Sequence, residues 1–117
     1  MSASIPSTGS NKQRFSQLDL YTDGDPDFKG VLIELMIDNL LELQQSLYEA
    51  NEQHDHEVFR KACHKVKTTL SMLDSKELSN IVEELINRIE GQDRIAIFHK
   101  LSGDIIKSLR EEKNNIG

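Results

Sequence analysis

Apolar and polar positions alternate along most of this chain with the period of an amphipathic α-helix. The longest such pattern runs from Asp27 to about Ala50, where apolar residues recur at spacings of three and four. Asp25 is placed to cap this helix, and Pro26 suits its first turn. Its apolar positions are Phe28, Val31, Leu32, Leu35, Leu40, Leu43 and Leu47. The pattern predicts a long helix that packs this apolar side against other elements.

Three further helices are predicted from the same period. The second begins after Asp55, which is placed as its N-cap, and runs through the stretch ACHKVKTTLSML (62–73). The stretch DSKE (74–77) has capping-box spacing and predicts a break, followed by a third helix that ends at Glu90. Asp93 is placed to cap the fourth. The apolar positions of the last two helices are Leu78, Ile81, Val82, Leu85, Ile89, Ile97, Phe98, Leu101, Ile105 and Leu109.

The start of the chain has a different composition. Residues 1–13 are mostly small and polar, which predicts a disordered polar tail. The stretch RFSQLDLY (14–21) predicts a short helix or turn that packs on a larger body. No segment alternates with period two, and there is no internal repeat. We therefore expect one all-α domain over residues 14–117, an antiparallel up-down four-helix bundle with a short N-terminal helical element.

Composition narrows the classes of function. The 117 residues are 37% hydrophobic and contain no long apolar run, so neither a transmembrane helix nor a secretory signal is predicted, and a cytoplasmic location is the default. A single cysteine, Cys63, excludes an internal disulfide, and no paired-cysteine zinc motif is present. The net charge of −6 argues against nonspecific binding to nucleic acid.

His64 is the candidate functional residue of the second helix. At about 100° per residue it lies about 160° from Val66, on the side opposite the apolar positions. Those positions are Phe59, Ala62, Cys63, Val66, Leu70 and Leu73. The outer side also carries Glu57, Arg60, Lys61, Lys67, Thr68 and Ser71. Residues 56–73 hold four basic residues and one acidic residue, so the outer side predicts either an anion site or a solvated helix face with scattered cations.

The chemistry that fits such a site is phosphoryl transfer. An exposed neutral imidazole is a nucleophile that attacks an activated phosphoryl group. Lys67 at i+3 is placed to pair with the phosphoryl oxygens, and Thr68 at i+4 leans back toward His64 on a continuous helix. The chain has no glycine-rich phosphate loop, and therefore no visible means of binding ATP. A donor protein must supply the phosphoryl group.

The stretch CHKVKTTLSMLD (63–74) resembles the histidine-containing phosphotransfer (HPt) domains of bacterial multistep phosphorelays, whose motif reads roughly Ala-His-x-Leu-Lys-Gly-Ser. His64 falls on the phosphoacceptor, Val66 on the aliphatic position and Lys67 on the lysine. Two positions differ, because Thr68 stands where many members have Gly and Asp74 where a helix-ending Gly is common.

The resemblance extends over about residues 15–110. LDLYTDGDPDF (18–28) looks like the short first element of the family and the entry to its long helix, and LSNIVEELINRIE (78–90) looks like the helix after the histidine. It implies a monomer in which Nε2 of His64 accepts a phosphoryl group from a receiver-domain aspartate and passes it to another response regulator. It also implies that Lys61, Lys67 and Thr68 assist.

The resemblance further implies the partners. These are response-regulator receiver domains and a hybrid sensor histidine kinase, with Mg²⁺ bound by the receiver and no cofactor held by this chain. The docking surface is expected on the outer faces of the first two long helices around His64.

Two other interpretations remain open. One is a pseudo-HPt domain, a helical adaptor that docks a signalling partner without phosphotransfer. The other is a metal site at His54, His56 and His64, for which no converging carboxylate and histidine set is present. We expect no metal there, and we expect His54, His56 and His99 to be surface polar residues. A thiol–imidazole pair is not expected, because Cys63 points inward.

Overall fold

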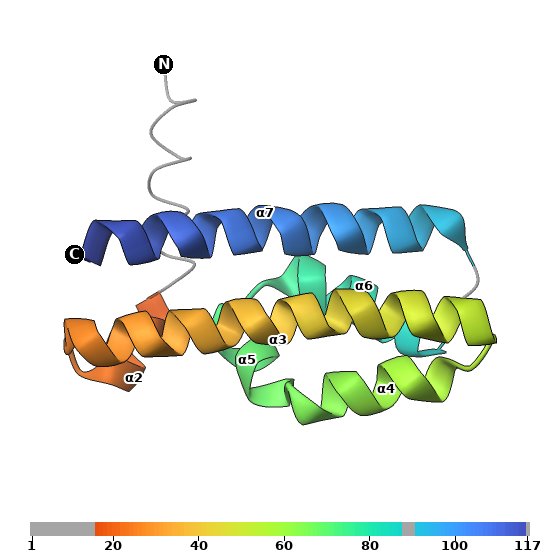
Figure 1. Ribbon diagram of the computed structural model, residues 1–117, viewed down its shortest axis with the longest axis horizontal. Coiled ribbons are helices and arrows are strands. Elements are labelled where there is room, and N and C mark those ends of the chain that lie inside the picture. Colours follow the sequence, from red (N-terminus) through yellow and green to blue (C-terminus); the bar gives the residue numbers. More distant parts are fainter. Residues whose placement is uncertain (1–15, 88–90, 117) are drawn as a thin grey trace, which may run out of the picture.

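The computed structural model describes residues 16–87 and 91–116. The predicted tail (1–13), Ile89 and the predicted end of the third helix at Glu90 lie outside these residues. The described part of the chain is helical without any strand, which confirms the all-α class (Figure 1). The helices are α2 (Ser16–Thr22), α3 (Pro26–Gln53), α4 (His56–Lys65), α5 (Lys67–Leu73), α6 (Lys76–Asn87) and α7 (Gln92–Ile116).

Four of the helices are neighbours in a closed ring. α3 packs against α4 and α7, and α6 packs against the same two helices. Figure 1 shows α3 and α7 side by side, and their contacts make them antiparallel. Lys29 near the start of α3 reaches Glu112 near the end of α7, whereas Gln44 reaches Ser102 further back. α2 packs against α3 and α5.

The core between these helices is apolar and includes side chains from each of them. Phe59 of α4 and Phe98 of α7 meet edge to face, with ring centroids 5.7 Å apart and an interplanar angle of 84°. The largest fully buried side chains are Leu18, Ile33, Met36, Leu40, Leu43, Leu47, Phe59, Leu73, Leu78, Leu85, Phe98 and Leu109.

Two of the predicted helix caps are confirmed. The Asp25 carboxylate accepts hydrogen bonds from the backbone N–H groups of Asp27 and Phe28, and Pro26 occupies the first turn of α3. The Asp55 carboxylate accepts from the N–H of Glu57 at 3.1 Å and so caps α4. These side chains satisfy donors that have no partner inside the helix, which explains why both helices begin where local sequence predicts.

Two other predicted caps are wrong. Asp74 does not cap α6: it ends α5 in the left-handed conformation, at φ 50° and ψ 39°, and the Ser75 hydroxyl accepts the N–H of Leu78 instead. Asp93 lies inside the first turn of α7, which begins at Gln92. The Gly91 carbonyl accepts the first helical N–H groups there, and Gly91 has φ 129°, which disfavours any residue with a side chain.

The prediction of one continuous helix from Asp55 through residues 62–73 is also wrong. α4 ends at Lys65, α5 begins at Lys67, and Val66 between them has φ −104° and ψ 22°. Val66, Thr68 and Thr69 are β-branched, and such residues have low helix propensity. A break in the helix here therefore costs little free energy.

The break changes which residues of α5 are buried. Leu70, predicted to face the core, is only partly buried, whereas Thr69 is 3% exposed. Val66 itself stays buried, so the chain bends without leaving the core.

The first half of α3 presents a second apolar side. Three residues predicted to face the core are exposed instead: Phe28 (48%), Val31 (68%) and Leu35 (52%). The side that packs inward consists of Leu32, Ile33, Met36, Ile37 and Leu40. Both sides of this segment are apolar, and the packing of the neighbouring helices decides which is covered. We refer to Phe28, Val31 and Leu35 as the α3 stripe. Ile97 of α7, also predicted to be in the core, is exposed too.

Lys29 links α2, α3 and α7 at one end of the molecule. Its ammonium lies 2.8 Å from Asp19 of α2 and 2.7 Å from Glu112 of α7, and its side chain is only 14% exposed. A cavity of about 240 Å³ beside it is lined by residues of α2, the α2–α3 turn, the start of α3 and the end of α7. None of its lining residues belongs to α4 or α5.

Candidate functional site

His64 lies in the last turn of α4 with its side chain exposed, as the helical stepping predicts. Cys63, the preceding residue, is buried. Burial raises the pKa of the Cys63 thiol to about 12. The thiol is therefore protonated near neutral pH and faces the core, so the adjacent residues do not form a thiol–imidazole pair.

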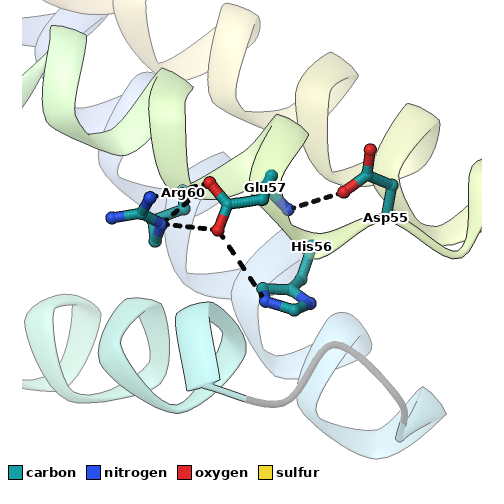
Figure 2. Close-up of polar contacts among 4 residues, drawn as sticks. All are labelled: Asp55, His56, Glu57 and Arg60. Carbon is teal, nitrogen blue, oxygen red and sulfur yellow. Dashed lines mark hydrogen bonds and ion pairs between the residues drawn. The ribbon is translucent and has the colours of Figure 1, made fainter.

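The cations around His64 fall into two groups. The Arg60 guanidinium donates to both carboxylate oxygens of Glu57, with its shortest contact at 2.7 Å (Figure 2). This hydrogen bond lowers the pKa of Glu57 and raises the pKa of Arg60. Lys65 pairs with Glu42 of α3 at 3.1 Å. Both of these cations are therefore already matched by a carboxylate.

Lys61 and Lys67 form the second group. Both are exposed, and within residues 16–87 and 91–116 no carboxylate lies within ion-pair distance of either. They are the basic residues near His64 that remain available to an anion. Thr68, also exposed, follows Lys67 at the start of α5. The break at Val66 separates both residues from His64, so the i+3 and i+4 geometry of a continuous helix does not apply to them.

The other histidines have separate local contacts. His54 ends α3 in the left-handed conformation. His56 lies with Nε2 4.0 Å from a carboxylate oxygen of Glu57 (Figure 2). The His99 ring meets Phe98 edge-on at 5.9 Å. All three are exposed, as predicted, and the described residues hold no group of three or more His, Cys, Asp or Glu side chains able to hold a metal ion.

The contacts between α3 and the segment after His64 were missed by sequence reasoning. Asn39 of α3 donates from Nδ2 to the Thr69 hydroxyl at 2.7 Å, and Glu42 is the partner of Lys65. These pairs are separated by 30 and 23 positions, so no local spacing signals them.

The α3 stripe lies on the side of α3 that faces this region. Phe28, Leu35 and Glu42 are spaced by seven residues, which is about two helical turns, so they lie on one side of the helix. Since Glu42 contacts Lys65, that side leads from the exposed apolar residues to the end of α4 that carries His64. The site therefore combines an exposed imidazole, two available cations and the exposed apolar residues of the α3 stripe.

Comparison of the chain with models of known protein families, with curated proteins and with solved structures finds no match. None of the described helices is long and apolar enough to cross a membrane. What the protein does must therefore be inferred from the chemistry of the site.

Proposed function

We propose that the protein is a histidine phosphotransfer protein of a multistep phosphorelay, with His64 as the phosphoacceptor. The observation that carries the proposal is the exposure of His64 on a helix that is otherwise anchored in the core, beside two cations without a carboxylate partner among the described residues. A neutral imidazole on such a helix is a nucleophile held at the surface, where a partner protein reaches it.

The proposed step is an exchange of one bond for another. A lone pair of the His64 imidazole, at Nε2 by resemblance to HPt domains, attacks the phosphorus of a receiver aspartyl phosphate. The N–P bond forms as the O–P bond breaks, and the aspartate leaves as a carboxylate with the bonding electrons. The reverse step delivers the group to the aspartate of a second receiver. Lys61 and Lys67 lower the energy of the transferring group by pairing with its oxygens.

The fold supports this proposal in two ways. The ring of contacts among α3, α4, α6 and α7, with α3 and α7 antiparallel, fits the up-down four-helix bundle of HPt domains, and α2 fits their short N-terminal element. Asp74, at the position where the family commonly has a helix-ending glycine, adopts the left-handed conformation that glycine favours. The difference from the family pattern at this position is therefore compatible with the proposal.

The partner is proposed to dock over the α3 stripe and the exposed end of α4. Leu20 and Tyr21 on α2, which packs against α3 and α5, are exposed as well. By resemblance to HPt domains, a receiver domain seated there brings both its aspartyl phosphate and its Mg²⁺. The protein would act as a monomer in the cytoplasm, between a hybrid sensor histidine kinase and a response regulator.

The test is phosphoryl transfer from a purified receiver domain carrying aspartyl phosphate, in the presence of Mg²⁺. The wild type is expected to gain an acid-labile, base-stable label. His64→Gln is expected to gain none, whereas His99→Gln, which removes another exposed histidine, is expected to label like the wild type. A label that persists in His64→Gln would refute the assignment.

The alternative is a pseudo-HPt adaptor that binds receivers without accepting phosphate. Two observations favour it: the exposed Thr68 in place of glycine, and the break that separates Lys67 and Thr68 from His64. The adaptor predicts receiver binding that depends on the α3 stripe, with no label on His64 from any receiver.

A further inference from the structure

Two residues of α3 hold the chain on both sides of the break at Val66. Before the break, the Glu42 carboxylate accepts a hydrogen bond from the Lys65 ammonium. After it, Asn39 donates to the Thr69 hydroxyl. Neither contact was expected from the sequence, and together they fix the end of α4 and the start of α5 against the same stretch of α3.

The two contacts differ in strength. The Glu42–Lys65 pair is exposed at both ends, and pairs of this kind contribute little to stability. Thr69 is almost fully buried, so its hydroxyl requires a hydrogen-bond partner inside the protein. Among the described residues every buried side-chain nitrogen and oxygen atom has such a partner, and Asn39 supplies one to Thr69 at 2.7 Å. Asn39 is thus the main polar anchor of α5.

We propose that Asn39 is a positioning residue for phosphoryl transfer. α5 begins with Lys67 and Thr68, and the break means that the α4 helix alone does not set where these side chains lie relative to His64. By holding Thr69, Asn39 sets the orientation of the first turn of α5 and with it the position of Lys67 relative to His64. This inference rests on the proposed function.

The hydrogen bond has a matched control in the same protein. Gln44 of α3 donates to the buried Ser102 hydroxyl of α7 at 2.8 Å. The two bonds have the same chemistry, nearly the same length and the same first helix, but the second leads to α7 rather than to α5. Both Gln44→Leu and Asn39→Leu are therefore expected to lower the free energy of unfolding. Only Asn39→Leu is expected to displace α5 relative to His64.

The experiment measures single-turnover transfer from a phosphorylated receiver domain over a range of receiver concentrations. Asn39→Leu and Thr69→Val are expected to lower the maximal rate about tenfold or more, with a half-saturating concentration close to that of the wild type. Thr69→Ser keeps the hydroxyl and is expected to restore the rate. Gln44→Leu is expected to transfer like the wild type. Equal rate losses in Asn39→Leu and Gln44→Leu, or no rescue by Thr69→Ser, would overturn the proposal.

A second measurement needs no partner. The NMR signals of the His64 ring and the Lys67 and Thr68 amides are expected to shift in Asn39→Leu and to stay in place in Gln44→Leu. Unchanged signals in Asn39→Leu overturn the positioning, whether or not transfer occurs. If the wild type takes no label from any receiver, the proposed function is overturned. The role of Asn39 in transfer is then overturned too, even where the NMR signals of His64, Lys67 and Thr68 shift.

Discussion

Replacing Lys29 by methionine is expected to destabilise the protein more than the same substitution of a lysine in an exposed ion pair. The substitution keeps most of the apolar stem and removes the ammonium that contacts Asp19 and Glu112. The contact with Glu112, which is mostly buried, is worth about 1.5 kcal/mol as a hydrogen bond between charged groups. The contact with Asp19, which is exposed, is worth about 0.5 kcal/mol. The free energy of unfolding should fall by about 2 kcal/mol.

Lys113→Met is the matched control, because Lys113 of α7 pairs with Glu34 of α3 at 2.9 Å with both side chains well exposed. Its expected cost is about 0.5 kcal/mol. Urea unfolding followed by far-ultraviolet circular dichroism suits a chain without tryptophan. For a slope of about 2 kcal/mol per molar urea, the Lys29→Met midpoint should fall by about 1 M. A Lys29→Met loss no larger than that of Lys113→Met would refute the reasoning from burial.

The Lys29 contribution also depends on pH. Burial lowers the pKa of Lys29, but hydrogen bonds to Asp19 and Glu112 outweigh this, and the pKa is raised above its ordinary value of 10.5. A folded-state pKa above the unfolded value means that the stabilisation is fully present below the unfolded pKa and is lost as pH rises through the folded one. The difference in stability between wild type and Lys29→Met should therefore stay constant from neutral pH to about pH 9 and narrow above about pH 10.5.

Three further outcomes are expected. Leu35→Asp should weaken receiver binding about tenfold or more in a titration, because it removes an apolar contact of the α3 stripe. Leu41→Asp, on a different side of the same helix, should bind like the wild type, and equal losses would place docking elsewhere. Asp74→Gly should raise the free energy of unfolding by about 0.5–1 kcal/mol in urea unfolding, because glycine adopts the left-handed conformation without strain. Thr68→Gly introduces the residue that many HPt domains have at this position and should speed transfer to His64, whereas Ser71→Gly should leave the rate unchanged. Equal rates in Thr68→Gly and wild type would remove Thr68 from the site.

Local sequence signals predicted the all-helical class and the starts of α3 and α4. The caps at Asp25 and Asp55 depend on side chains that bond to the backbone two or three residues away, so the sequence carries all the information needed. The exposure of His64 likewise follows from helical stepping over a few residues. Short-range geometry of this kind is read directly from spacing.

The remaining features depend on packing between distant segments. Both sides of the start of α3 are apolar, and periodicity alone does not say which side α4, α6 and α7 cover. No local spacing signals the left-handed conformation of Asp74 or the break at Val66, and α5 has its neighbours in distant segments, because it packs against α2 and bonds to α3 through Thr69. The Asn39–Thr69 bond joins positions that are 30 residues apart. In each case the deciding neighbour lies far away in the sequence.

The burial of Cys63 supplies a built-in reporter of motion next to His64. A thiol that faces the core, with a pKa raised to about 12, reacts with an alkylating reagent only when the surrounding helix opens. Since Cys63 is the single cysteine of the chain, its labelling rate needs no correction for other sites. The same rate, measured with and without a bound receiver, would show how strongly a partner holds α4 closed at the residue beside the imidazole.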